Sequence, residues 1–191
     1  MSGIAAVGYF LFNLVFSAVT FFLWIRFALR YFRVSSLHPI SQTIDRFTYP
    51  IIRPIQGLFT SSNIRSNRYD WACLSTLVIV EVLKFILFGL LFSGTFPSII
   101  FLLLHALGEL ILEPCNLMFY AILIRVIISW VNPLLKNPMM DLLYLFTEPL
   151  LRLARSFVPV FSGIDFSPFI VMIALKVITL FIGASLPPSF F

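Results

Sequence analysis

Four ionisable side chains lie deep inside long apolar runs of the sequence, where a charge is costly and usually faces a partner. They are Glu81, Lys84, Glu113 and Lys176. A rise of about 1.5 Å per residue from the ends of their runs predicts two pairs at matched depth, Glu81 with Lys176 and Glu113 with Lys84. Such pairs could form an ion or proton path, or they could be structural ion pairs that fix how the helices pack. The sequence leaves both interpretations open.

A second polar set has a spacing that a metal site could use. His105, Glu109 and Glu113 are spaced at i, i+4 and i+8, which places them on one face of a helix. Imidazole and carboxylate groups are metal ligands, but one helix rarely supplies a whole site and no second histidine lies near. We therefore expect a polar face toward other helices or the outer interface, with no metal and no cofactor.

The sequence contains none of the motifs that define common catalytic sites. The GxSxG, HExxH, Walker and dinucleotide-binding patterns are all absent. Asp70 and Asp165 each precede an apolar run, where a carboxylate interacts favourably with the positive end of a helix. We interpret them as helix-start carboxylates, and we expect no catalytic residues and no enzymatic activity.

The composition excludes a soluble globular domain. Hydrophobic residues are 60% of the 191 and charged residues 11%, against about 45–50% and about 25% in soluble domains. The remaining class is an all-α polytopic membrane protein with four transmembrane helices. The expected spans are 4–29, 71–92, 98–131 and 168–186. The third exceeds the length that a bilayer requires, so we expect it to tilt, to kink near Pro114 or to protrude.

The positions of the basic residues predict the orientation in the membrane. Eleven of the 13 Lys and Arg residues lie in or beside the two segments 30–70 and 132–167. The positive-inside rule makes these segments cytoplasmic and places both termini outside. Basic residues beside a membrane fit anionic headgroups better than nucleic acid. The eleven are Arg26, Arg30, Arg33, Arg46, Arg53, Arg65, Arg68, Arg125, Lys136, Arg152 and Arg155.

The chain repeats itself at an offset of 99 residues. Arg26 aligns with Arg125, and the stretch 48–53 (TYPIIR) aligns with 147–152 (TEPLLR). Beyond this stretch the offset becomes 95, which aligns Asp70 with Asp165. We therefore predict two repeats, 1–95 and 96–191, each a span, a cytoplasmic interfacial segment and a second span. Two spans per repeat give both repeats the same orientation, so the repeats are parallel.

Each interfacial segment has the pattern of an amphipathic helix. In the first repeat the predicted apolar face is Ile40, Ile44, Phe47 and Ile51, opposite Ser41, Gln42, Asp45 and Arg46. In the second repeat Leu142, Leu143 and Phe146 lie opposite Asp141 and Tyr144.

The prolines of the repeated motif predict a joint between two interfacial helices. Pro50 and Pro149 suit the first turn of a new helix, and Thr48 and Thr147 could cap that start. The arginine that ends each motif, Arg53 or Arg152, would then lie at headgroup level.

Three stretches resemble the YggT family of small bacterial membrane proteins and its plastid relatives of the YlmG/CCB3 type. They are 123–130 (LIRVIISW), 147–152 (TEPLLR) and 163–168 (GIDFSP), and the likeness covers nearly the whole chain. The first repeat carries a degenerate copy of the third stretch at 65–71.

The resemblance implies a cell-membrane protein linked to osmotic-stress tolerance through uptake of potassium or another ion. No catalytic residue or cofactor is agreed for this family. Its plastid relatives are linked to nucleoid distribution and to assembly of a cytochrome complex. Two functions remain open. One is ion transport or its regulation, which would need a homo-oligomer because four helices enclose little space. The other is a membrane scaffold or assembly factor that organises lipid or partner proteins through its basic interfacial helices.

Overall fold

A computed structural model describes residues 3–57, 70–94, 96–132, 137–157 and 165–186, and its regular elements there are all helices. This confirms the all-α fold class. In chain order the elements are α1 (Gly3–Tyr31), α2 (Pro39–Gln56), α3 (Trp71–Phe88), the π-helical turn η2 (Gly89–Ser93), α4 (Ile99–Val131), α5 (Pro138–Arg155) and α6 (Ser167–Ser185).

Four helices are long and apolar enough to cross a membrane, as the sequence predicts. They cover Ala5–Tyr31, Trp71–Phe92, Ile99–Val131 and Ser167–Ser185. The third runs through Pro114 as one helix of 33 residues, so the proline does not divide the span in two. At about 1.5 Å per residue this helix is about 50 Å long, which exceeds a hydrocarbon core of about 30 Å.

The chain forms two compact units. The first unit is Met1–Leu110 with Leu186–Phe191, and the second unit is Ile111–Ser185. Their boundary falls inside α4, whereas the sequence divides the repeats at 95 and 96. The repeat boundaries therefore stay a prediction.

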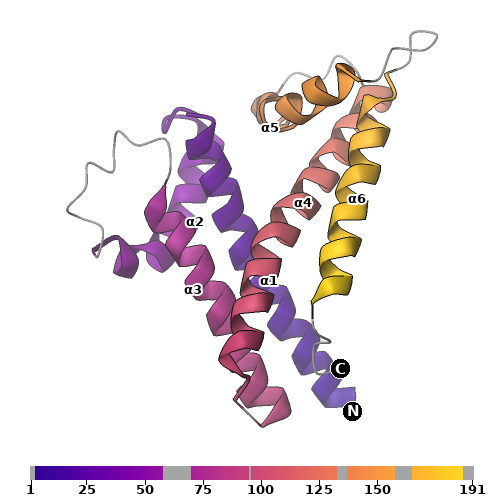
Figure 1. Cartoon of the computed structure of the whole chain (residues 1–191). Coiled ribbons are helices and arrows are strands. Elements are labelled where there is room, and N and C mark those ends of the chain that lie inside the picture. Colours follow the sequence, from indigo (N-terminus) through magenta and orange to yellow (C-terminus); the bar gives the residue numbers. More distant parts are fainter. Residues whose placement is uncertain (1–2, 58–69, 95, 133–136, 158–164, 187–191) are drawn as a thin grey trace. The chain divides into compact units, whose positions relative to one another are not determined.

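In the first unit, α2 packs against the C-terminal half of α1 and the N-terminal half of α3 (Figure 1). Leu23 of α1, Ile52 of α2 and Leu77 of α3 are each fully buried in one core. One apolar residue of the interfacial helix thus fills the space between the two spans.

The second unit repeats this arrangement. Figure 1 shows α5 lying across the ends of α4 and α6. Its core contains Ile122 of α4, Leu151 of α5 and Met172 of α6. These positions follow Leu23 and Ile52 by 99 residues and Leu77 by 95, so the sequence offsets recur in the buried residues.

The predicted joint at the motif proline is wrong, because α2 and α5 are each one helix. Pro50 and Pro54 lie inside α2, and Pro149 lies inside α5. An internal proline removes one N–H donor at a cost of about 3 kcal/mol, which the packing of the helix against two spans can offset. The prolines at a helix start are instead Pro39 and Pro138.

The motif threonines do not cap a helix either. Thr48 Oγ1 donates to the carbonyl of Ile44 at 2.7 Å, and Thr147 Oγ1 donates to that of Leu143 at 2.7 Å. Both bonds run to the residue four positions earlier, inside the helix. The side chain that caps α5 is Asn137, which accepts from the N–H groups at the start of that helix.

The apolar face predicted for α2 is only partly correct. Ile44 is buried, but Phe47 is 60% exposed and Ser41 is buried. The buried face is centred on Thr48, because the helix turns this hydroxyl toward α1. In α5, Leu142 is buried and Asp141 is exposed, as predicted.

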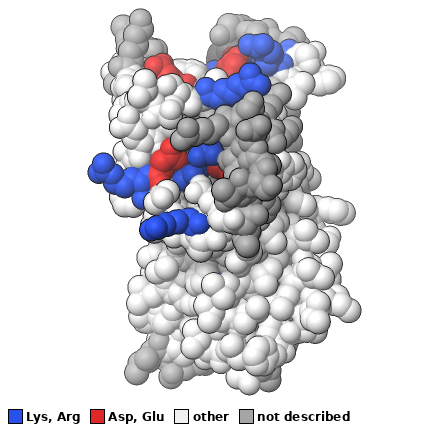
Figure 2. Space-filling view, turned by 90° about the vertical axis from the view of Figure 1, so that its left-hand side faces the viewer, with Lys and Arg blue, Asp and Glu red and all other residues white. Residues whose placement is uncertain are grey.

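In the face shown in Figure 2, the Lys, Arg, Asp and Glu side chains lie in the upper part, and the described surface of the lower part is uncharged. This distribution fits an apolar band in lipid beneath a charged level at the headgroups.

Candidate functional site

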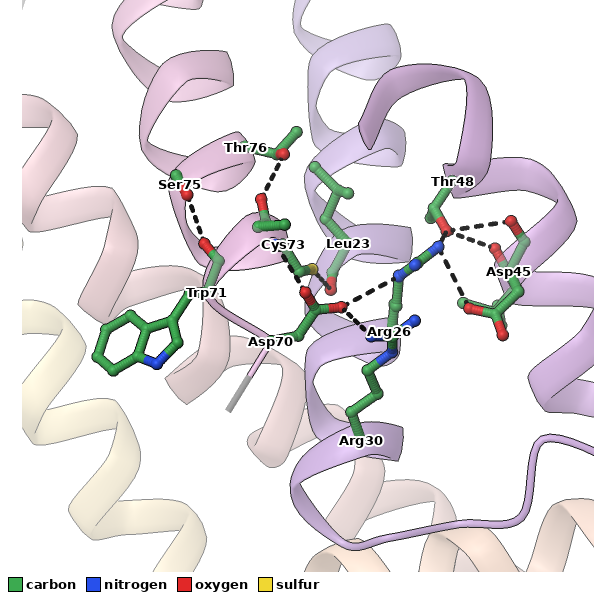
Figure 3. A network of polar contacts seen from close by, with 12 residues as sticks. Leu23, Arg26, Arg30, Asp45, Thr48, Asp70, Trp71, Cys73, Ser75 and Thr76 are labelled. Atoms are coloured by element: carbon green, nitrogen blue, oxygen red, sulfur yellow. Dashed lines mark hydrogen bonds and ion pairs between the residues drawn. The ribbon is translucent and has the colours of Figure 1, made fainter. Parts of the chain in front are cut away.

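The first unit places the buried Arg26 of α1 in a polar network with α2 and α3 (Figure 3). The guanidinium donates from Nη1 to Thr48 Oγ1 at 2.8 Å and lies 3.2 Å from Asp45 Oδ1. Its Nε lies 3.5 Å from Asp70 Oδ2. Arg30 Nη1 reaches the same oxygen at 3.0 Å. We call these residues, Arg26, Arg30, Asp45, Thr48 and Asp70, the Arg26 network.

Arg26 and Asp70, the two charges at the centre of the Arg26 network, are both buried. The side chain of Arg26 is 3% exposed and that of Asp70 is fully buried. Asp70 is also the N-cap of α3, where Oδ1 accepts from the N–H of Cys73 at 3.1 Å. One carboxylate therefore caps a helix start and forms ion pairs with two arginines, and it joins α3 to α1.

The second unit contains a matching network around Arg125 of α4. Arg125 Nη1 donates to Thr147 Oγ1 at 2.7 Å, and Nη2 donates to Glu148 Oε2 at 2.8 Å. Arg155 then links Glu148 to Asp165, through contacts of 2.9 and 2.8 Å. Asp165 Oδ1 accepts from the N–H of Ser167, the first residue of α6. We call Arg125, Thr147, Glu148, Arg155 and Asp165 the Arg125 network.

The two networks share the arginine–threonine bond and the aspartate before the second span, but they differ in how the arginine is linked to that aspartate. In each, an arginine of the first span donates to a threonine 22 residues later in the interfacial helix. In each, the aspartate before the second span belongs to the network. The first unit joins arginine and aspartate directly, whereas the second uses Glu148 and Arg155 as intermediates. Each network contains two arginines and two carboxylates, so each is formally neutral.

The carboxyl groups of the Arg125 network are held in the ionised form. Hydrogen bonding from Arg125 lowers the pKa of Glu148. Burial opposes ionisation of Asp165, but bonds from Ser167 and Arg155 outweigh it and lower its pKa. The bond to Asp165 also raises the pKa of Arg155.

These shifts predict how the stability of the second unit depends on pH. A carboxyl group with a lowered folded-state pKa stabilises the fold above its ordinary pKa, and this contribution is lost as the pH falls through the folded-state pKa. The thermal midpoint should therefore fall more steeply below about pH 4 in the wild type than in Glu148→Gln. Parallel midpoints of the two proteins during acid titration in detergent would contradict the assignment.

The threonine contact can be tested with a matched pair of substitutions. Thr48→Val removes the acceptor of Arg26 and should destabilise the protein by about 1–3 kcal/mol, because a buried charged donor loses its bond. Thr43, also in α2, donates only to its own helix at Pro39 and is exposed. Thr43→Val should change thermal unfolding little, and equal losses for the two variants would argue against the contact.

A second group of charges lies inside the spans of the first unit. Lys84 Nζ of α3 is 3.4 Å from Glu81 Oε2 of the same helix and 3.9 Å from Glu109 Oε1 of α4. The side chain of Glu81 is 1% exposed and that of Lys84 is 10% exposed. We call Glu81, Lys84 and Glu109 the Lys84 cluster.

The two pairs predicted by depth join residues of different units. Glu81 and Lys84 belong to the first unit, while Glu113 and Lys176 belong to the second. Within the second unit, Lys176 Nζ lies 4.9 Å from the ring centroid of Phe119, a cation–π contact. The pairing of Glu81 with Lys176 and of Glu113 with Lys84 stays a prediction.

The remaining predicted residues lie on the outer surface of the interfacial helices. Pro50, Arg53, Pro149 and Arg152 are all exposed, which is compatible with headgroup contact. Arg65, Arg68 and Lys136 lie outside the described residues.

Sequence reasoning missed four members of the networks, namely Arg30, Asp45, Glu148 and Arg155. The sequence assigns Arg30 and Arg155 only to membrane topology, Asp45 only to the polar face of an amphipathic helix, and Glu148 only to an alignment between the repeats. One signal was available, since the spacing of 22 residues between arginine and threonine occurs in both repeats.

Chemically, the two networks suit structure more than catalysis. Their charges cancel, and the ion pairs described above join members of the same network to one another. No group of three His, Cys, Asp or Glu side chains in the part of the chain that the structure describes is placed to hold a metal ion. The Lys84 cluster differs, because Glu81 and Lys84 are buried within an apolar span.

Fold and site together define a multi-pass α-helical membrane protein built from two similar units. Comparison with known sequences gives the family. The chain belongs to the CCB3/YggT family, whose pattern matches residues 5–91 and 98–186. The resemblance inferred from three short stretches is thereby confirmed.

Several bacterial relatives match over most of their length. The chain is 30% identical to "Uncharacterized protein in proC 3'region" of Vibrio alginolyticus, over 95% of this chain and 94% of the relative. It is 30% identical to "Uncharacterized protein YggT" of Escherichia coli K12, over 90% and 86%. It is 31% identical to an uncharacterized protein of Haemophilus influenzae, over 80% and 76%. No solved structure matches the chain.

Proposed function

We propose that this protein contributes to osmotic-stress tolerance in the cell inner membrane through transport of an ion, potassium foremost, or through regulation of that transport. The observation that carries the proposal is the Lys84 cluster. Glu81 and Lys84 are buried in the middle of an apolar span. Ionisable side chains are rare within membrane spans, and those that occur there often line ion or proton paths.

The proposal includes an orientation and an assembly. The basic segments face the cytoplasm and both termini lie outside, as the distribution of Lys and Arg favours. The pathway forms in a homo-oligomer, because four spans enclose little space. Substituted-cysteine labelling from each side of the membrane tests the orientation at Ser36 and Ser185, which should be labelled from opposite sides.

Ion flux in proteoliposomes tests the activity. Potassium, sodium and proton gradients are imposed in turn on vesicles that contain the purified protein. We expect flux above that of empty vesicles, and its loss in Glu81→Gln/Lys176→Met. Arg53→Gln, at an exposed position outside the spans, is the matched control and should retain flux. Absence of flux from protein with a normal melting transition would overturn the proposal.

A second candidate function is supported by the outer surface of α2 and α5. Arg46 and Arg53 of α2 are exposed beside Phe47 and Tyr49. An amphipathic helix with basic and aromatic residues on its outer face binds anionic membrane surfaces. On this proposal the protein is a scaffold or assembly factor that organises lipid or recruits a protein partner. Arg53→Gln/Arg152→Gln should then reduce crosslinking to partners while leaving the melting transition unchanged.

A further inference from the structure

Two arginines on the outer side of α2 have no carboxylate partner in the part of the chain that the structure describes. Arg46 and Arg53 are exposed and form no ion pair there, whereas the four arginines of the two networks each contact a carboxylate. All eight Asp and Glu residues of the chain lie within the described ranges. An anion that binds Arg46 and Arg53 therefore comes from another molecule.

The two arginines share one face of α2 with a tyrosine. Arg46, Tyr49 and Arg53 are spaced at i, i+3 and i+7, and all three are exposed. The arginines lie two turns apart, about 10 Å along the helix axis. A guanidinium group binds phosphate through two parallel hydrogen bonds, and tyrosine is enriched at the level of lipid headgroups. We call Arg46, Tyr49 and Arg53 the Arg46 face.

A ring contact beside this face indicates its depth. The ring of Phe47 stacks on that of Phe22 in the span of α1, with centroids 5.7 Å apart. This side of α2 therefore faces the apolar layer, while the side of Thr48 is buried against α1. At about 100° per residue, Arg46 and Arg53 lie about 100–120° around the helix from Phe47 and farther from Thr48. They therefore occupy the boundary at which lipid phosphates lie.

The corresponding face of α5 has a different charge. The offset of 99 residues aligns Arg46, Tyr49 and Arg53 with Leu145, Glu148 and Arg152. Glu148 is 33% exposed and belongs to the Arg125 network. Two positive charges in α2 thus correspond to one positive and one negative charge in α5, so only the face in α2 has a net charge that attracts an anion.

We propose that the Arg46 face binds the phosphate groups of anionic phospholipids and that the corresponding face of α5 does not. Two guanidinium groups favour a headgroup with a net negative charge over a zwitterionic headgroup, because the zwitterion adds a cation beside them. This inference rests on the second candidate function. It names an anionic phospholipid as the partner and assigns the contact to the first unit.

Native mass spectrometry of the full chain in detergent tests the proposal. The protein is titrated with phosphatidylglycerol or with phosphatidylcholine of the same acyl chains, and the two dissociation constants are compared. We expect the wild type to prefer phosphatidylglycerol. Arg46→Gln/Arg53→Gln should weaken binding of phosphatidylglycerol by about 25-fold, about fivefold for each arginine, and leave binding of phosphatidylcholine unchanged.

Arg152→Gln is the matched control, because Arg152 is the exposed arginine of α5 that aligns with Arg53 and also forms no ion pair among the described residues. It should retain the preference for phosphatidylglycerol. Thermal unfolding shows whether each variant is folded, and the wild-type comparison of the two lipids stands without any variant.

Three results would overturn the proposal. They are equal binding of the two lipids by the wild type, an unchanged preference in Arg46→Gln/Arg53→Gln, and an equal loss in Arg152→Gln. Equal binding would assign the Arg46 face to a soluble anionic partner. A preference for phosphatidylglycerol that depends on Arg46 and Arg53, with partner crosslinking unchanged in Arg53→Gln/Arg152→Gln, would contradict only the recruitment of a protein partner. Loss of crosslinking together with equal binding of the two lipids would contradict only this inference.

Discussion

Replacing Arg26 by methionine should destabilise the protein by about 3–5 kcal/mol, because breaking a buried ion pair leaves its partner charged and uncompensated. Asp70 has a fully buried side chain, and Arg26 is one of the two arginines that neutralise it. The same substitution removes the donor to Thr48. Thermal unfolding in detergent, followed by circular dichroism, measures the loss.

Two further variants determine whether burial causes this loss. Arg125→Met breaks the matching contacts in the second unit, but Glu148 is 33% exposed and water can replace part of the interaction. Its loss should therefore be smaller than that of Arg26→Met. Arg53→Met, at an exposed position of α2, should change stability little. Equal effects of all three substitutions would show that the networks do not hold the interfacial helices in place.

Replacing Lys84 by methionine should have an effect of similar size, about 3–5 kcal/mol, because it removes the ammonium group that forms an ion pair with the buried carboxylate of Glu81. Adding Glu81→Gln should restore part of the loss. A double-mutant cycle on these two positions should give a coupling energy of about 1–3 kcal/mol, as expected for buried groups in direct contact.

A second cycle compares this contact with the pair predicted from the sequence. Glu81→Gln combined with Lys176→Met measures the coupling between the two units. Coupling there as well as with Lys84 would place Glu81 between two cations. Coupling with Lys176 alone would contradict the assignment of Lys84 as the partner of Glu81. Additive losses in both cycles would show that Glu81 forms neither pair.

The spans were predictable because a single property determines them. A long run of apolar residues has only one stable arrangement across a bilayer, a helix that satisfies its own backbone. The buried positions of the interfacial helices were harder to predict from the sequence. Ile44 and Leu142 have the expected burial, but Phe47 does not, because Thr48 turns toward Arg26 and rotates the buried face.

The networks were harder to predict because their partners depend on tertiary structure. The repeat identified Arg26, Thr48, Arg125 and Thr147, yet it assigned the arginines to topology and the threonines to helix caps. The predicted role of Asp70 at the helix start explains the contact of its Oδ1 with the N–H of Cys73. Its Oδ2 instead forms ion pairs with two arginines of α1, which precede Asp70 by 40 or more residues in the sequence. The sequence also could not show that a helix continues through Pro50, since that depends on packing against two spans.

Each network closes within one unit, and this has an evolutionary consequence. Every residue of the Arg26 network lies between positions 26 and 70, and every residue of the Arg125 network lies between 125 and 165. A half-length ancestor would therefore have carried a complete set of these contacts, and two copies could have associated before their genes fused. In a fused chain, each half could then exchange charges independently. The direct arginine–aspartate contact of one half and the glutamate–arginine relay of the other are two arrangements that such independence permits.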